Sequence, residues 1–386
     1  MRQNSLRFVF APNPMGGGKS GEGGAIAVAG GDGELGFHII GRLREEGYTD
    51  IRCIGLRPFR DAAACSSFIC DIAGPPGSPD RLTLCDALKG CSGVICALMP
   101  PLMTAPKEAF FLSNVDAVGV LIEESERHGV KSFVHISSIA VMNHFVDHVN
   151  VDESAPLPKP SEYRSPYDAT KRLGEEKVLA VSSDMWTLSL RCGGIISSHR
   201  AMQFMGLYEK TGILLWAGKP IDTTHGVNVA WAAHLGLSAL ASRQDDVNRE
   251  VFYVTGEPLN QRDVAIHMTS RLGNTYTILP FILVQAILGG MWLAHGIKRL
   301  FACVFRSSSV PAIGLHQFVQ MGKFSQTFSN EKARRVLNYT PILSTDEAFD
   351  RIVAEYRASL ANSPVPGQGK QGTGPDEPVA YGARHT

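Results

Sequence analysis

The chain has 386 residues, and its 37 Lys and Arg residues balance 37 Asp and Glu residues to a formal net charge of zero. That balance argues against a nucleic-acid-binding protein, which usually carries a basic surface. Hydrophobic residues make up 44% of the chain and charged residues 19%, which is enough for a buried core and excludes disorder throughout. The eight cysteines form no CxxC pair and no zinc-type spacing with histidine, so we expect a reduced intracellular compartment and no metal site.

Both ends of the chain have the composition of disordered segments. Residues 1–23 include a polar run rich in glycine and proline, and residues 361–386 have the same character. Such segments bury too little apolar surface to offset the entropy that is lost on ordering. We therefore predict a flexible extension, a folded body and a disordered tail.

From Gly24 onward, apolar runs of strand length alternate with segments of helical periodicity. This alternation predicts an α/β fold: a doubly wound, Rossmann-like parallel sheet covered by helices on both faces. We assign 24–198 to a dinucleotide-binding domain and 199–360 to a smaller C-terminal substrate-binding region, with parts of 220–260 returning to the first domain. The expected strands are 25–29, 51–56, 94–98, 133–136 and 187–191, and the expected helices are 35–46, 114–128 and 167–180.

A glycine-rich turn follows the first expected strand. Gly30, Gly33 and Gly36 have the spacing GxxGxxG, and Glu34 and Leu35 open the helix that comes next. Glycines are needed there because the chain turns sharply, its backbone approaches a pyrophosphate, and the helix packs tightly on the strand. We predict that these five residues bind a dinucleotide.

The choice between NAD and NADP stays open at this point. The second strand ends at Gly55 without the acid that would hold the ribose hydroxyls of NAD, and Arg57 could pair with the 2′-phosphate of NADP. Asp32, in the glycine turn, would repel that phosphate. Asp71 and Ile72 follow the third strand, where they are placed to contact the adenine edge.

A second group of residues indicates proton transfer. The strand at 133–136 leads into Ser137 and Ser138, and Tyr167 and Lys171 follow at a spacing that puts both on one helix face. A nearby ammonium lowers the pKa of a phenol from about 10, so that the phenolate can act as a base near neutrality. A serine hydroxyl at the strand end can hold the same substrate oxygen.

In this order, the motifs resemble the extended short-chain dehydrogenases/reductases, within them the group of 3β-hydroxysteroid dehydrogenases and sterol-4α-carboxylate 3-dehydrogenases (decarboxylating). The similarity runs from Gly24 to about Tyr356. Besides the glycine turn and the Tyr167/Lys171 pair, the matching pieces are Leu56-Arg57-Pro58, Asp71-Ile72, Ala87-Leu88-Lys89-Gly90, Asn114-Val115, Gly129-Val130-Lys131, Leu190-Arg191-Cys192-Gly193-Gly194-Ile195, Val227-Asn228-Val229-Ala230, Tyr253-Val254-Thr255-Gly256-Glu257-Pro258 and the segment 332–341. The chain departs from the family's usual acid at Gly55, proline at Cys192, Asp at Val227 and Gly at Asn338.

The resemblance implies an NAD- or NADP-dependent enzyme that oxidises the 3β-hydroxyl of a sterol or triterpenoid to a ketone. It makes Ser138, Tyr167 and Lys171 the catalytic residues, with Tyr167 and Lys171 also contacting the cofactor. If the substrate carries a 4-carboxylate, the product is a β-keto acid that can lose carbon dioxide. The family's usual homodimer would use the segments 114–128 and 167–180.

An uncharged apolar stretch covers 275–297 in the C-terminal region. A membrane span needs about 20 apolar residues, but Pro280, Gln285 and the pair Gly289-Gly290 interrupt this one. A monotopic anchor, a buried helix over an apolar site and a true span all stay open, and we expect attachment to the cytoplasmic face of the endoplasmic reticulum. Each of the first two implies an apolar substrate.

Two alternatives come from other classes of protein. A sugar-nucleotide epimerase or dehydratase of the same superfamily would need cationic contacts for a second pyrophosphate, which Lys210 and Lys219 could supply. A catalytically silent dinucleotide-binding protein could share the fold, but it would have no reason to keep Ser138, Tyr167 and Lys171 together.

Overall fold

The computed structural model describes residues 24–102, 104–196, 213–214, 218–273, 277–278, 283, 286–287, 289–290, 293–294 and 323–361. The predicted extension at 1–23, the tail after 361 and most of the apolar stretch at 275–297 lie outside the described residues. Within the described residues, no helix is long and apolar enough to cross a membrane.

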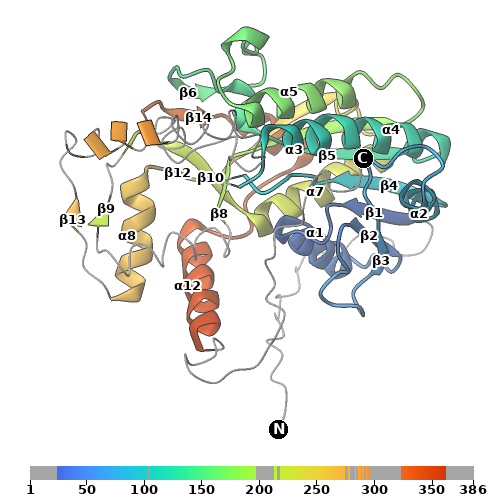
Figure 1. Ribbon diagram of the computed structural model, residues 1–386, viewed down its shortest axis with the longest axis horizontal. Helices are drawn as coiled ribbons and strands as arrows, with labels where there is room; N and C mark the ends of the chain where they lie inside the picture. The colour runs from blue at the N-terminus through green and yellow to red at the C-terminus, as the bar shows by residue number, and fades with distance from the viewer. Residues whose placement is uncertain are drawn as a thin grey trace.

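A parallel sheet of seven strands forms the centre of the protein (Figure 1). Its order is β11-β7-β5-β4-β1-β2-β3, so successive strands are added on one side of β1 and then on the other. The reversal between β1 and β4 is the topological switch point at which α/β folds bind their ligands. This arrangement confirms the doubly wound, Rossmann-like fold. The strands are β1 Ala25–Ala29, β2 Ile51–Gly55, β3 Ser66–Ile69, β4 Cys91–Cys96, β5 Ser132–Ser138, β7 Trp186–Cys192 and β11 Glu250–Val254.

Helices cover both faces of this sheet because alternate strand residues point to opposite sides. Ile26 and Val28 of β1 pack with the apolar residues of α1 (Glu34–Glu45), α7 (Gly226–Ala241) and α11 (Glu331–Leu337). The alanines of β1 face the other cluster, which is built from α2, α4 and α5. The helices of this second face are α2 Pro79–Leu88, α3 Lys107–Phe111, a π-helical turn Leu112–Asp116, α4 Ala117–Arg127 and α5 Pro166–Leu179.

A second, smaller sheet lies beyond the carboxyl edge of the first (Figure 1). Its order is β12-β10-β14-β6, and β8 pairs with β10 beside that path. Its strands are β6 His148–Val151, β8 Gly194–Ile196, β10 Ile221–His225, β12 Pro258–Leu259 and β14 Gln326–Phe328, and a separate short pair joins β9 Ile213–Leu214 to β13 Thr277–Ile278. Two short 3-10 turns are η2 Ile139–Met142 and η3 Pro160–Glu162.

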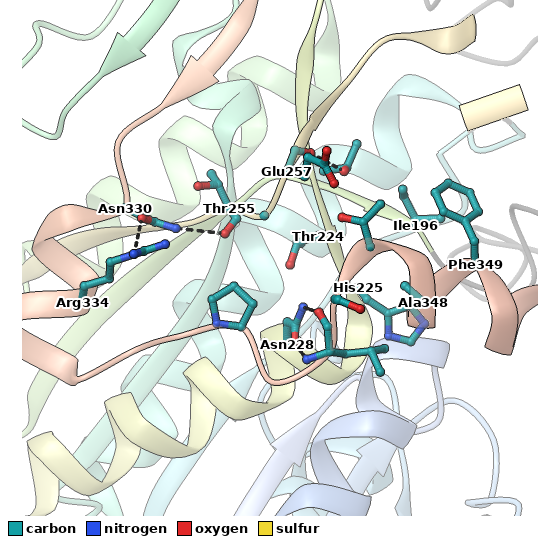
Figure 2. A pocket seen from close by; sticks show the side chains of 16 residues that line it. Ile196, Thr224, His225, Asn228, Thr255, Glu257, Asn330, Arg334, Ala348 and Phe349 are labelled. Atoms are coloured by element: carbon teal, nitrogen blue, oxygen red, sulfur yellow. Dashed lines mark hydrogen bonds between the residues drawn. The ribbon is translucent and has the colours of Figure 1, made fainter. Parts of the chain in front are cut away.

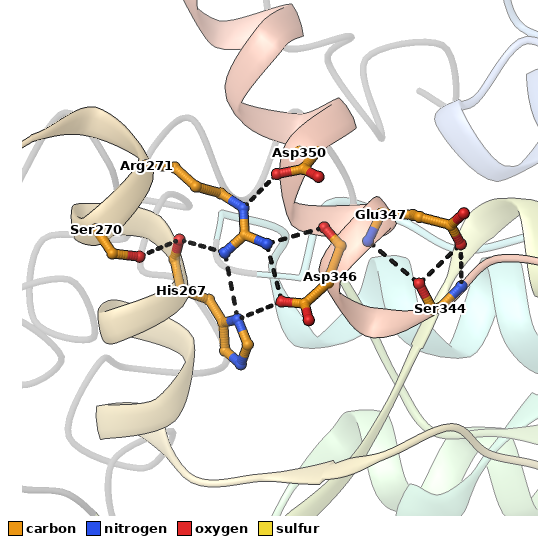
Figure 3. Close-up of polar contacts among 7 residues, drawn as sticks. All are labelled: His267, Ser270, Arg271, Ser344, Asp346, Glu347 and Asp350. Carbon is orange, nitrogen blue, oxygen red and sulfur yellow. Dashed lines mark hydrogen bonds and ion pairs between the residues drawn. The ribbon is translucent and has the colours of Figure 1, made fainter.

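The helices α8 (Gln261–Leu272) and α12 (Thr345–Ala361) pack together next to this sheet. Arg271 of α8 donates to Asp350 at 2.6 Å and to Asp346 at 2.9 Å on α12 (Figure 3). His267, one turn earlier, stacks on Phe349 with its ring centroid 4.7 Å away. Charged and aromatic contacts therefore align two helices that are far apart in the sequence.

Candidate active site

The glycine turn between β1 and α1 has the shape that a bound pyrophosphate requires. Gly30 has a φ of +76°, in the left-handed region that favours glycine. A Cβ on Gly36 would lie 2.4 Å from the Gly30 carbonyl oxygen and 2.5 Å from Gly31 Cα, so only glycine lets the helix approach the turn this closely. Gly33 precedes the first residue of α1. The helix N-terminus therefore faces the turn, as the sequence predicts, and this cradle fits a dinucleotide phosphate.

This turn also borders the end of β4. The Ala97 amide donates to the Ala29 carbonyl at 2.9 Å, and a Cβ on Gly30 would lie 2.8 Å from the Ala97 carbonyl oxygen. The glycine turn and the chain after β4 are thus in contact at the switch point, on the carboxyl edge of the sheet.

Lys171 of α5 reaches the same edge. Its Nζ donates to the backbone carbonyl oxygens of Leu98 at 3.2 Å and of Ile136 at 3.1 Å, just after β4 and near the end of β5. The side chain is 4% exposed, and burial lowers the pKa of its ammonium group. These two carbonyls therefore hold the cation in a fixed position. One of them belongs to Leu98, the residue after Ala97, and Ala97 contacts the glycine turn.

Tyr167 lies one helical turn before Lys171, at the start of α5. Ser165 caps this helix by accepting the Tyr167 amide at 3.2 Å, and Pro166 occupies its first position. The tyrosine ring is half-buried and meets Phe110 edge to face, with ring centroids 6.2 Å apart. Leu102, Ala105 and Ala109 join Phe110 in this apolar cluster around the ring, on the side of α3.

The two serines at the end of β5 differ in exposure. Ser137 is buried, whereas Ser138 is half-buried and its Oγ accepts the Ala140 amide at 3.2 Å. Ser138 also pairs with Cys192 of β7 across the sheet. The structure therefore brings the strand end that carries Ser138 and the helix that carries Tyr167 and Lys171 to one edge of the sheet.

The adenosine end of the predicted site lies beside β2. Asp32 of the glycine turn accepts from Arg57 Nε at 3.4 Å. Asp71 follows β3, and its carboxylate accepts the Ala73 amide at 3.0 Å, while the Ile72 side chain is buried in the core. The residues that the sequence singled out thus surround the ends of β1, β2 and β3.

Asn114, which the sequence places only at the start of an expected helix, lies behind the catalytic helix in the structure. It is 1% exposed, lies in the π-helical turn, and donates to Thr170 Oγ1 at 3.0 Å. A Cβ on Gly174 would lie 2.2 Å from the Asn114 carbonyl oxygen, so glycine permits the close approach of α5 to this turn. A π-turn inside an otherwise α-helical segment often marks a functional site, but the periodicity of the sequence does not reveal it.

A cavity of about 320 Å³ lies elsewhere, between the second sheet and the start of α12 (Figure 2). Thr224, His225 and Asn228 line one side of it, and Asn330 and Arg334 line the other. Asn330 donates to the Thr255 carbonyl at 3.1 Å and accepts from Arg334 at 3.0 Å. None of the predicted catalytic residues lines this cavity.

One group of possible metal donors occurs within the described ranges, formed by Cys85, Glu124 and His128. Arg81 and Arg127 both donate to Glu124 Oε1, at 2.8 and 3.0 Å. Because two guanidinium groups already neutralise that carboxylate, we assign it no metal.

Known proteins resemble the chain in sequence and in fold. Sterol-4-alpha-carboxylate 3-dehydrogenase, decarboxylating, of Schizosaccharomyces pombe is 27% identical over 68% of this chain and 76% of its own length. The Homo sapiens protein of that name is 27% identical over 86% of this chain and 87% of its own length. A short-chain dehydrogenase/reductase superfamily protein from Agrobacterium tumefaciens, solved with bound NAD, superposes with a TM-score of 0.63 at 20% identity, covering 87% of this chain and 98% of that one.

The similarity to solved structures shows the fold alone, since solved sugar-nucleotide epimerases match at 16% to 17% identity as well. The family model is more specific. The 3-beta hydroxysteroid dehydrogenase/isomerase family matches residues 27–279, which include the glycine turn, both serines, Tyr167 and Lys171. Since this match spans more than half of the chain, the protein belongs to the 3-beta hydroxysteroid dehydrogenase/isomerase family.

Proposed function

We propose that the protein is an NAD(P)-dependent oxidoreductase that converts the 3β-hydroxyl of a sterol or triterpenoid to a ketone, with loss of a 4-carboxylate as carbon dioxide. The observation that carries this proposal is the position of Lys171. Its ammonium group binds the carbonyl of Leu98, next to Ala97, which contacts Gly30 of the dinucleotide turn. The residue that is expected to activate Tyr167 therefore lies close to the predicted cofactor turn, which supports one shared site.

Each catalytic side chain has a defined task in the chemical step. The cation of Lys171 favours the phenolate of Tyr167, which accepts the proton of the substrate hydroxyl. Ser138 donates a hydrogen bond to the same oxygen and holds it as the carbonyl forms. When bound, the nicotinamide ring supplies the acceptor for the hydride that leaves the carbinol carbon. Gly30 and Gly36 admit the pyrophosphate and thereby fix where that ring lies.

The surroundings of Tyr167 support an apolar substrate. Phe110, Ala109 and Leu102 pack against its ring on the α3 side, so the ring has apolar surroundings on that side. The curated relatives act, by their names, on sterol 4-carboxylates. Oxidation at C3 of such a compound gives a β-keto acid, and the enolate left by loss of carbon dioxide carries its charge on the oxygen that Tyr167 and Ser138 hold.

The epimerase alternative is less well supported. It needs cations for a second pyrophosphate, and Lys219 instead pairs with Asp147 at 2.7 Å. Lys210, the other candidate, lies outside the described residues.

A substrate panel tests the proposed function. Purified full-length protein is incubated with 3β-hydroxy sterols, with and without a 4-carboxylate, and with NAD or NADP, and the products are identified by mass spectrometry. We expect the 3-ketone in every productive reaction and loss of carbon dioxide only from the carboxylated substrates. Tyr167→Phe, which retains the ring against Phe110, should bind dinucleotide but give no product. Turnover of UDP-sugars alone, or equal turnover by Tyr167→Phe, would overturn the proposal.

We also propose that the segment 275–297 attaches the protein to the cytoplasmic face of the endoplasmic reticulum. Supporting this, the large apolar residues described there, Leu283, Ile287 and Leu293, are 47%, 39% and 59% exposed. Leu283 and Ile287 are four residues apart in the sequence, the spacing of one face of an interfacial helix. An active site at the membrane surface would receive an insoluble substrate without moving it through water.

Cell fractionation tests this attachment. Changing Leu283, Ile287 and Leu293 together to serine should move the protein from the membrane to the soluble fraction. A control changes three exposed apolar residues elsewhere, Ile69, Leu82 and Val149, to serine and should leave the distribution unchanged. A wild-type protein found wholly in the soluble fraction, without detergent, would refute the proposal.

A further inference from the structure

The carboxylate of Asp32 occupies the space that a side chain at position 55 would fill. A Cβ on Gly55 would lie 2.1 Å from Asp32 Oδ1 and 2.5 Å from its Cγ. The two residues meet because the Gly30 amide donates to the Ile54 carbonyl at 2.8 Å, which draws the glycine turn over the end of β2. The Asp32 side chain therefore lies directly against Gly55, and only a residue without a Cβ fits there.

This contact bears on the absence of an acid at the end of β2. In dinucleotide-binding folds, an acid at the end of the second strand binds the ribose hydroxyls of NAD and disfavours the 2′-phosphate of NADP. Here the strand provides only Gly55 at that place, and a carboxylate arrives from the glycine turn instead. We propose that Asp32 replaces the acid at the end of β2, binds the adenosine ribose hydroxyls, and makes the enzyme selective for NAD; this inference rests on the proposed function.

The position of Arg57 fits the same assignment. Its Nε lies 3.4 Å from Asp32 Oδ2, and its side chain is 51% exposed whereas that of Asp32 is 12% exposed. The carboxylate is thus the more enclosed partner, and it neutralises the cation that would otherwise favour a phosphate. A 2′-phosphate placed there would meet the charge of Asp32, while two ribose hydroxyls can donate to it.

Binding measurements on the full-length protein test the inference without depending on turnover. The dissociation constants of NADH and NADPH are measured by nicotinamide fluorescence for the wild type and for Asp32→Asn, which keeps the shape and removes the charge. We expect the wild type to bind NADH at least about tenfold more tightly, and Asp32→Asn to lose about tenfold of that preference. Asp61→Asn, an exposed acid on the connection between β2 and β3, is the matched control and should leave the ratio unchanged.

A transposed variant makes the test sharper. Asp32→Gly combined with Gly55→Asp removes the contacts below 3.1 Å that a Cβ at 55 would make and returns the acid to the strand. It should recover the preference for NADH that Asp32→Gly alone loses. Equal or tighter binding of NADPH by the wild type, or an unchanged ratio in Asp32→Asn, overturns the role of Asp32 while leaving the proposed function intact. Failure of the wild type to bind either dinucleotide overturns both.

Discussion

Lys171 donates a hydrogen bond from Nζ to the backbone carbonyl of Leu98, at 3.2 Å, and so ties the helix of the predicted base to the strand end beside the glycine turn. A second bond to Ile136, at 3.1 Å, ties the same ammonium to β5. Because both acceptors are main-chain atoms, the position of the cation depends on the sheet and not on mobile side chains. Burial lowers the pKa of Lys171, whereas the two carbonyls accept hydrogen bonds from its ammonium group.

Replacing Lys171 should impair both chemistry and cofactor binding. Lys171→Met retains much of the side-chain volume but removes the charge and both hydrogen bonds, so we expect kcat to fall by about 10²- to 10⁴-fold and the dissociation constant of NADH to rise. Steady-state kinetics and fluorescence titration measure the two effects. Lys177→Met, an exposed position on the same helix, should change neither. Wild-type kcat in Lys171→Met would contradict the assigned role.

The tight packing of α1 on the glycine turn predicts a specific sensitivity at Gly36. Gly36→Ala would place a Cβ 2.4 Å from the Gly30 carbonyl oxygen, and backbone atoms cannot move aside without shifting the turn. We expect about 1 to 3 kcal/mol lower stability in urea and markedly weaker NADH binding. Gly119→Ala in α4, where the nearest neighbour is Lys177 Nζ at 3.4 Å, should instead be neutral or stabilise the helix.

Much of this architecture could be predicted from local sequence. The first strand, at 25–29, has the predicted bounds, and α1 and β2 differ from them by one residue at most. The strand expected at 94–98 runs from Cys91 to Cys96 instead, since Ser92 and Gly93 interrupt the apolar run without ending the strand. Asn338, where the family usually has glycine, has a φ of +55°, a conformation that asparagine tolerates better than most residues.

The cofactor preference could not be predicted in the same way. Asp32 and Arg57 give opposite signals when they are considered separately, and the sequence does not reveal that Asp32 lies over Gly55. That contact depends on the pairing of Ala29 with Ile54 in parallel strands, a long-range register. The sequence does not reveal the π-helical turn around Asn114 either, because a single turn of five residues is too short to establish a periodicity of its own.

The buried pair of Glu175 and Arg191 should be important for the stability of the catalytic helix. Arg191 Nη2 lies 2.7 Å from Glu175 Oε1, both side chains are at most 4% exposed, and Ser189 donates to the same carboxylate at 2.9 Å. Burial of an unpaired charge is costly, so Glu175→Gln should lower the free energy of unfolding by about 3 to 5 kcal/mol. The double variant Glu175→Met, Arg191→Met should lose less unfolding free energy than the sum of the losses in the single variants Glu175→Met and Arg191→Met. Additive losses in that double-mutant cycle would show that the pair is not coupled.

The pH dependence of stability should have a contribution from Asp222 in β10. This carboxyl is 2% exposed and accepts the Phe328 amide of β14 at 2.6 Å, and burial raises its pKa to about 7. An unfolded Asp titrates near 4. The folded state therefore binds one more proton than the unfolded state between about pH 4 and 7, and the stability present below this window is lost as the pH rises through it.

Asp222→Asn removes this proton but retains an oxygen that can accept the Phe328 amide. Relative to the variant, the wild type should lose up to about 1.4 kcal/mol of unfolding free energy per pH unit between pH 5 and 7, and the difference should level off above pH 7. Urea denaturation at pH 5, 6, 7 and 8 measures the two curves. Asp61→Asn, which changes an exposed acid, serves as the control and should follow the wild type. Parallel curves for the wild type and Asp222→Asn would mean that Asp222 stays ionised in the folded protein, held by the Phe328 amide at the junction of β10 and β14.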